Sequence, residues 1–109
     1  MVRFLVLYST PENVRAFQEH YRNVHIPLTQ NLPGLRRYTL SRNVRSIRGG
    51  DPYYLVAEMD WDDMDALEQA FRSPDGAATA EDVTANLERL SPGIRSMIFE
   101  LEDVVSARS

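Results

Sequence analysis

The chain begins with an almost unbroken apolar segment, residues 2–8, which is rich in β-branched and aromatic side chains. A run without polar alternation predicts a strand that is covered on both faces. The segment is far shorter than a membrane span, and it lacks the small-residue cleavage site of a secretory signal. We therefore expect a central strand here, in a cytoplasmic protein without a membrane partner.

A helical pattern follows this strand. Residues 9–12 (Ser-Thr-Pro-Glu) supply a capping hydroxyl, a proline and an acid, which is typical of a helix start. The apolar residues that recur at spacings of three and four are Val14, Phe17, Tyr21, Val24 and Leu28. Such a stripe predicts one buried helix face. Because Pro27 has no amide proton, we expect the helix to break or kink around His25 and Ile26.

The middle of the chain predicts an antiparallel pair of strands. Residues 31–34 (Asn-Leu-Pro-Gly) form a turn signature, and residues 35–44 alternate as a half-buried strand does. Residues 48–52 mark a loop that is rich in glycine and proline. Residues 53–59 are again apolar, so we expect a third strand that pairs with the second through this loop.

The second half predicts two more helices and a fourth strand. Residues 61–71 carry an apolar stripe of helical spacing, with Asp62 or Asp63 placed as a cap. The Ser-Pro pair at 73–74 fits the cap and first turn of another helix. The apolar residues of that helix are Ala80, Val83, Leu87 and Leu90. After a Ser-Pro-Gly turn, residues 95–101 form the last expected strand.

The element order is β-α-β-β-α-β, which indicates an α+β, ferredoxin-like domain with a four-stranded antiparallel sheet and helices on one face. We place this domain at residues 1–103 and a polar tail at residues 104–109. The first and last strands are apolar on both sides, so one sheet face is left uncovered. Because such a face typically marks an interface, we expect a homodimer through the sheet faces, a dimeric α+β barrel.

Composition narrows the chemistry. The 109 residues fit a single domain. They include no cysteine, which excludes disulfides, thiolate metal sites and a cysteine nucleophile. A formal net charge of −4 makes nucleic acid a poor candidate partner. Residues 36–48 hold several arginines and no acid, and we favour a solvated hairpin edge there over an anion or nucleic-acid site.

Two histidines are available for acid–base chemistry, and both lie on the first expected helix. At about 100° per residue, His25 lies about 60° from the centre of the apolar stripe and His20 about 80° on the other side, so both are boundary residues. His25 stands at the expected helix end, where unpaired carbonyls favour an imidazolium. Two interpretations of His25 stay open: an active-site group, or a satisfied side chain that only bonds nearby carbonyls.

Metal and cofactor sites find little support in the sequence. The two histidines are five residues apart, and no other cluster of histidine with acids is visible, so we expect no metal site. We find no phosphate-binding glycine loop, no Gly-x-Ser-x-Gly elbow and no dinucleotide fingerprint, so we expect no cofactor. Glu58 and Asp60 could act as a general base, but edge or capping carboxylates are the favoured interpretation.

Two neighbouring motifs resemble the EthD family of the dimeric α+β barrel superfamily. The first is residues 17–28, Phe-Gln-Glu-His-Tyr-Arg-Asn-Val-His-Ile-Pro-Leu, and the second is residues 32–38, Leu-Pro-Gly-Leu-Arg-Arg-Tyr. With weaker matches over residues 61–82, they cover nearly the whole domain. The resemblance implies a homodimer with a pocket between the sheet and the helices of each subunit, where His25 is the polar feature and Tyr38 lies close by.

The family takes its name from a gene needed to break down an ether fuel additive beside a cytochrome monooxygenase system. Because the resemblance implies a pocket with His25 and Tyr38 close together, we assign these two as candidate catalytic residues. The imidazole would move a proton, and the phenol would hold a ligand oxygen. The residues expected to contact the ligand are Tyr21, Leu28, Trp61 and Phe71.

Three functional hypotheses follow. The first is an enzyme or accessory protein that acts on a small apolar organic intermediate in catabolism or secondary metabolism, by cofactor-free proton transfer of the isomerase, cyclase or reductase-labelled kind. The second is a non-catalytic binding or carrier module, in which His25 is only a hydrogen-bond partner. The third, which we place last, is a haem-binding protein similar to the monooxygenases of the superfamily. Whether the protein is an enzyme stays open at this point.

Overall fold

The computed structural model describes residues 1–105, and its elements follow the order expected from the sequence. The strands are β1 (Val2–Tyr8), β2 (Arg37–Leu40), β3 (Leu55–Trp61) and β4 (Arg95–Glu100). The helical segments are α1 (Val14–His20), the π turn η1 (Tyr21–His25), α2 (Ile26–Gln30), α3 (Met64–Arg72), α4 (Pro74–Asp82), the π turn η2 (Val83–Leu87) and α5 (Glu88–Leu90). Of the expected tail, residues 106–109 lie outside the described part.

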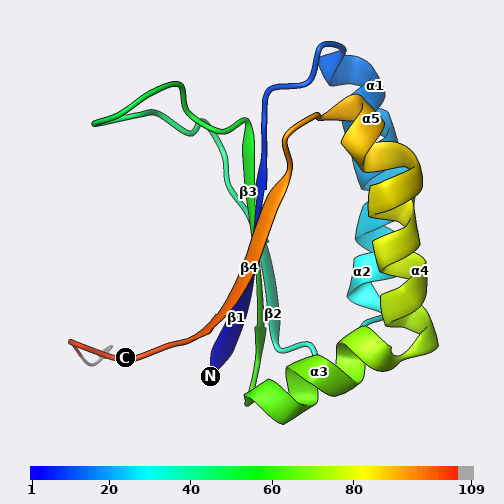
Figure 1. Ribbon diagram of the computed structural model, residues 1–109, viewed down its shortest axis with the longest axis vertical. Helices are drawn as coiled ribbons and strands as arrows, with labels where there is room; N and C mark the ends of the chain where they lie inside the picture. Colours follow the sequence, from blue (N-terminus) through cyan, green and yellow to red (C-terminus); the bar gives the residue numbers. More distant parts are fainter. Residues whose placement is uncertain (106–109) are drawn as a thin grey trace.

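The four strands form one antiparallel sheet in the order β2-β3-β1-β4, and all helices cover the same face (Figure 1). This is the expected α+β, ferredoxin-like fold. No helix within residues 1–105 has the length and apolar character needed to cross a membrane.

Strand β1 lies in the middle of the sheet, as its apolar sequence predicts. Val2, Val6 and Tyr8 point toward the helices and are buried. Leu5 and Leu7 occupy the alternate positions, so they face away from the helices. The face that carries them has no cover in the single chain (Figure 1). The loop between β2 and β3 and the C-terminal segment both extend toward that side.

Several predicted boundaries are wrong. The second strand is confined to Arg37–Leu40 instead of residues 35–44, and residues 41–54 leave the sheet as a long loop. Trp61 ends β3 instead of opening the next helix, because its backbone continues the pairing with Val2. Helix α3 begins only after Asp63, whose carboxylate accepts a hydrogen bond from the backbone N–H of Ala66.

The helix does not break at Pro27, because the helical backbone runs on from α1 through η1 into α2, but its regular α-helical bonding is interrupted by the π turn that ends at His25. Within this stretch the backbone N–H of Ile26 donates to the carbonyl of Tyr21, five residues earlier. The wider turn lets the helix pass a proline that has no N–H to donate. It also shifts the buried face within the turn, so that Val24 is exposed and His25 is buried, not a boundary residue. Val14, at the start of α1, is exposed as well.

Trp61 anchors the turn that precedes β2. Its side chain is fully buried, and its indole N–H donates to the carbonyl of Pro33 at 2.9 Å. Gly34 has a φ of +73°, and a Cβ there would lie 3.3 Å from the indole ring. Only glycine adopts this backbone conformation without strain while leaving the indole in place. The Leu-Pro-Gly motif is therefore a packing element of the core.

Candidate active site

A cavity of about 210 Å³ lies between the sheet and the helices. Its walls come from β1, from the η1–α2 and α4–η2 segments opposite, and from single residues of β3 and α3. Most of the lining side chains are apolar. The polar side chains at its wall are Tyr8, His25, Thr29, Thr79 and Ser96. The cavity therefore offers an apolar environment with few polar contacts.

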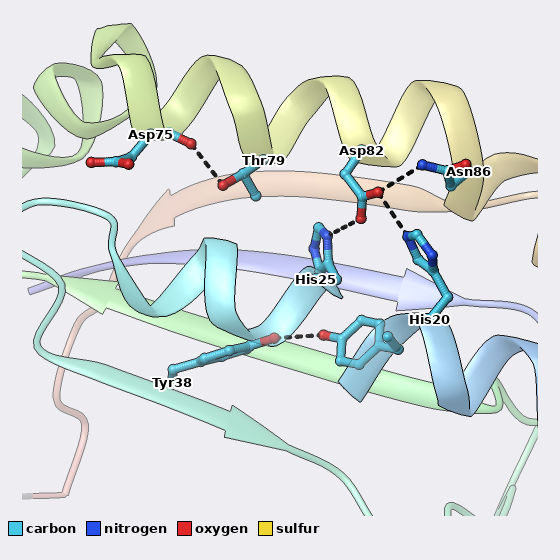
Figure 2. Close-up of polar contacts among 8 residues, drawn as sticks. His20, His25, Tyr38, Asp75, Thr79, Asp82 and Asn86 are labelled. Atoms are coloured by element: carbon cyan, nitrogen blue, oxygen red, sulfur yellow. Dashed lines mark hydrogen bonds and ion pairs between the residues drawn. The ribbon is translucent and has the colours of Figure 1, made fainter. Parts of the chain in front are cut away.

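His25 is held in this wall by a carboxylate from the opposite helix. Its Nδ1 lies 2.9 Å from Oδ2 of Asp82, the last residue of α4. The second oxygen, Oδ1, lies 2.7 Å from Nε2 of His20 and 2.8 Å from the amide nitrogen of Asn86. Figure 2 shows the carboxylate between the two imidazoles. Asp82 thus joins the first helix to the second.

The π turns make this arrangement possible. In a regular α-helix, side chains five residues apart point about 140° away from each other. The π turn η1 lies between His20 and His25, and both imidazoles reach one carboxylate. The second π turn, η2, begins directly after Asp82. Because π turns are rare and frequently occur at functional sites, two of them at one ion cluster indicate a functional role for it.

The charges of the cluster define which nitrogen of His25 carries a proton. Burial lowers the pKa of His25, although the hydrogen bond to Asp82 and its charge act to raise it. Burial also acts to raise the pKa of Asp82, but hydrogen bonds from Asn86, His20 and His25 outweigh it and lower that pKa. At neutral pH Asp82 is therefore ionised, and His25 is neutral with a proton on Nδ1.

The other nitrogen of His25, Nε2, has no hydrogen-bond partner among residues 1–105. Because Nδ1 carries the proton, Nε2 presents a lone pair to the cavity that His25 lines. The fixed tautomer and the buried carboxylate behind it are the features of an imidazole that accepts protons as a general base.

Two of the four hydroxyl groups in the wall, those of Tyr8 and Thr29, belong to buried residues. Thr29 lies one helical turn after His25, is 1% exposed, and its Oγ1 has no hydrogen-bond partner. A buried hydroxyl without a partner is costly unless a ligand or water satisfies it. Tyr8 is also buried, and burial raises its pKa, so its phenol stays protonated and able to donate. The wall therefore combines one proton acceptor with two potential donors from buried residues.

The structure distributes the residues expected at the site over two places. His25 and Phe71 line the cavity, whereas Tyr21, Leu28, Tyr38 and Trp61 are not among its lining residues. Tyr21 and Tyr38 lie beside it, with their hydroxyl oxygens 2.7 Å apart (Figure 2), and the Tyr21 ring centre is 5.1 Å from that of His25. Burial raises the pKa of both phenols.

Asp82 is the functional candidate that the sequence analysis missed, because no cluster of histidine with acids is visible along the chain and only the fold brings Asp82 to both imidazoles. Hydrophobic periodicity reveals an α-helical stripe but not a π turn. The spacing of His20 and His25 therefore placed their side chains on opposite sides of that stripe. The sequence signal that could have found it is the resemblance itself, which reaches residue 82. Within the described chain, no group of three or more histidine, cysteine, aspartate or glutamate side chains is placed to hold a metal ion.

Acid is expected to weaken the fold in two steps. The pKa of His25 is lower in the folded than in the unfolded chain, so the unfolded chain binds more protons just below about pH 6.5. The free energy of unfolding therefore falls as the pH drops from about 6.5 through the folded pKa of His25. Asp82 adds a loss of the same sign below about pH 4, because its pKa is also lowered by folding.

Urea unfolding followed across the range from about pH 7.5 to about pH 3.5 measures both steps. His25→Asn is the matched variant, since its amide does not titrate but can still donate to Asp82. The variant should lose the step that begins below about pH 6.5 and keep the one below about pH 4. An identical pH dependence in both proteins above about pH 4 would contradict the assignment to His25.

Solved structures of low sequence identity share this fold. SnoaB, a cofactor-independent oxygenase from Streptomyces nogalater, is 23% identical with a TM-score of 0.66, and the match covers 97% of each chain. A dimeric protein of unknown function and ferredoxin-like fold from Bacteroides fragilis is 12% identical with a TM-score of 0.61, over 92% of this chain and 95% of that one. At these identities the likeness shows the fold alone.

Closer matches show the family. Residues 10–87 match the EthD domain. An EthD family protein from Bacillus halodurans is 40% identical with a TM-score of 0.82, over 94% of this chain and 99% of that one. An uncharacterized 11.0 kDa protein of the thcB-thcC intergenic region of Rhodococcus erythropolis is 32% identical over 96% of this chain and 98% of its own. The chain therefore belongs to the EthD family.

Proposed function

We propose that this protein is an enzyme that moves a proton on a small, uncharged organic molecule, with His25 as the proton acceptor and no cofactor. One observation carries the proposal: Nε2 of a neutral, buried imidazole faces an apolar cavity, while an ionised aspartate holds Nδ1. An acceptor that lies in an apolar wall and is backed by a carboxylate is suited to general-base catalysis.

The proton balance of such a step is simple. Nε2 of His25 takes a proton from a carbon or oxygen of the substrate, and the electron pair left behind moves onto a conjugated substrate oxygen. The imidazolium is stabilised by the negative charge of Asp82. The hydroxyls of Tyr8 and Thr29 supply donors for the substrate oxygen. Return of the proton to another substrate atom completes an isomerisation. In a dehydration the returning electron pair forms a C=C bond, a C–O bond breaks, and the leaving hydroxyl takes the proton as water. In a ring closure the carbanion forms a C–C bond to a carbonyl carbon of the substrate, and the resulting alkoxide takes the proton.

The cavity defines the class of substrate. A volume of about 210 Å³ compares with the roughly 150 Å³ of an engineered apolar cavity that binds benzene. The ligand should therefore be about one ring in size, with one polar end directed at His25. Among the lining residues, His25 is the one whose side chain can carry a positive charge, so an uncharged substrate fits better than a charged one.

Of the remaining expected site residues, only Phe71 lines the cavity, and the others support the lining residues in this proposal. Tyr38 meets Tyr21 through the hydroxyl pair, so we assign it a role through Tyr21 rather than direct contact with the ligand. Phe71 contacts the ligand, and Trp61 supports it through an edge-to-face contact with ring centres 6.2 Å apart. Leu28 is half-buried on α2 and contributes to the packing of that helix.

Haem does not fit this cavity. A volume of about 210 Å³ is below the roughly 300–1,000 Å³ of pockets that hold drug-sized ligands, and a porphyrin is at least as large as such ligands. Chemistry without a cofactor is compatible with the fold, since SnoaB performs it.

Deuterium exchange tests the proposal without knowledge of the product. The protein is incubated in D2O with a panel of small lactones, phenols and cyclic ethers, and NMR follows deuterium at each carbon position. We expect exchange at a carbon next to a carbonyl or phenolic oxygen of one compound class, and its loss in His25→Asn. Binding to the wild-type protein without any exchange would instead support the carrier module.

We further propose that the open sheet face forms the expected homodimer. Its apolar side chains are Leu5, Leu7, Val56, Met97 and Phe99. Arg3 lies among them and is neutralised by Asp60 at 2.8 Å and Glu58 at 3.1 Å. Arg37 and Arg95 also lie on this face, on the edge strands β2 and β4. The middle of the face, where the charge of Arg3 is paired, is suited to burial. The dimeric fold neighbour from Bacteroides fragilis supports this assembly.

The replacement Met97→Glu is expected to dissociate this dimer, because it places an unpaired charge in the buried face. Ile98→Glu is the matched control, since Met97 and Ile98 are both 43% exposed in the single chain but point to opposite faces. Light scattering should give twice 12.5 kDa for the wild type and the control, and 12.5 kDa for Met97→Glu. A wild type that is monomeric at all concentrations would refute the dimer.

A further inference from the structure

His20 lies on the solvent side of the cluster that holds His25. The side chain of His20 is 21% exposed, compared with 6% for His25 and 5% for Asp82. Its Nε2 donates to Oδ1 of Asp82, the oxygen that His25 does not use. Asn86 bonds the same oxygen, but it belongs to the helical segment that follows Asp82. His20 is therefore the contact that fixes Oδ1 from the opposite helix (Figure 2).

We propose that His20 is a positioning residue of this site: it holds Asp82 in place for His25, and the two imidazoles compete for the charge of one carboxylate. The inference rests on the proposed function for its biological meaning. Its physical content, the coupling of two histidines through Asp82, is independent of any substrate.

The positioning role follows from the geometry. A carboxylate held at one oxygen can rotate about its side-chain bond, whereas Asp82 is held at both. Because one bond reaches α1 and the other the end of η1, both oxygens are tied to the first helix on the two sides of a π turn. Loss of the bond to His20 would leave Oδ1 held by Asn86 alone, which follows Asp82 in the same helical segment, so Oδ1 would no longer be tied to the first helix. The tautomer that leaves Nε2 unprotonated would then lose part of its support.

The competition follows from the charges. Asp82 supplies one negative charge, so a second imidazolium at the same carboxylate has no counter-ion of its own. The charge of His20 accordingly acts to lower the pKa of His25. The other titratable groups that face the cluster are Tyr8 from β1, Tyr21 from η1 and Tyr38 from β2, and burial keeps their phenols neutral. His20 thereby favours the neutral, proton-accepting form of His25.

Because the chain has two histidines, NMR can follow their imidazole signals with little overlap. We would titrate the ligand-free protein and its His20→Gln variant from about pH 4.5 to about pH 8.5. The glutamine amide can replace Nε2 as donor to Asp82, but it cannot carry a charge. We expect the midpoint of His25 to rise by about half to one pH unit in His20→Gln. Glu19→Gln, a charge change beside His20 on the exposed side, is the matched control and should leave this midpoint unchanged.

A midpoint of His25 that is the same in wild type and His20→Gln would overturn the competition. A second variant, His20→Leu, tests positioning because leucine cannot bond Asp82. The Nδ1 proton of His25 should exchange with water faster in His20→Leu than in His20→Gln, and equal exchange would overturn the positioning role. Both readouts use ligand-free protein, so a failed search for turnover leaves them intact, and a failed coupling leaves proton transfer by His25 standing.

Discussion

Replacement of His25 with asparagine is expected to lower kcat/KM for proton transfer by about 10²- to 10⁴-fold, the usual contribution of a positioned general base. The asparagine amide can still donate to Asp82 from the place of Nδ1, so the cluster keeps its contacts while Nε2 is removed. The rate of deuterium exchange into the substrate identified in the panel measures this effect directly. The affinity for the ligand should change far less than the rate, because the apolar walls stay in place.

Asp82→Asn is a second variant in which the rate of proton transfer is compared with that of His25→Asn. The amide has nearly the shape of the carboxylate but no negative charge, so it neither stabilises the imidazolium nor enforces the tautomer with Nε2 free. The rate should fall in this variant as well. A His25→Asn protein that retains its rate within about threefold would show that another group accepts the proton, and would leave binding as the role of the cavity.

Replacement of Trp61 with alanine is expected to lower the free energy of unfolding by about 3–5 kcal/mol, as for other large aromatic residues removed from a core. The side chain is fully buried, bonds the carbonyl of Pro33 and contacts the ring of Phe71. Its loss would leave a cavity and an unpaired carbonyl. Since Trp61 is the single tryptophan of the chain, urea unfolding must be followed by far-UV circular dichroism instead of fluorescence.

Two further substitutions are compared with Trp61→Ala by their effect on the free energy of unfolding. Trp61→Phe keeps most of the packing and loses the hydrogen bond, so its cost should be about 1–3 kcal/mol. Ile47→Ala removes an apolar side chain that is 99% exposed and should have no measurable effect. A loss of less than about 1 kcal/mol in Trp61→Ala would show that the Leu-Pro-Gly turn is not anchored in the way described here.

The fold was predictable because its strands and helices differ in hydrophobic period. The apolar run of β1 fixed a central strand, and the Ser73 cap with Pro74 marked the start of α4. The element to which Trp61 belongs was harder to predict from the sequence, since a tryptophan before two aspartates fits either the end of a strand or the start of a helix. Pairing with Val2 across the sheet decides between them, and that is a tertiary contact.

The candidate site was predictable only in part. His25 could be singled out as the histidine beside a proline in a helix, and the structure places it in the cavity wall. Its partner Asp82 comes from a helix that is distant in the sequence, and the two π turns that align the cluster leave no simple periodic signal. Tyr38 was expected close to His25, and its hydroxyl lies 2.7 Å from that of Tyr21, whose ring centre is 5.1 Å from that of His25.

The crystal structure of the protein after soaking with the small lactones, phenols and cyclic ethers tests the central claim most directly. We expect one ordered molecule in the cavity, with an acidic C–H or O–H group directed at Nε2 of His25 and an oxygen within hydrogen-bond distance of Thr29 or Tyr8. A cavity that stays empty with every compound, or a ligand whose polar end points away from His25, would contradict it.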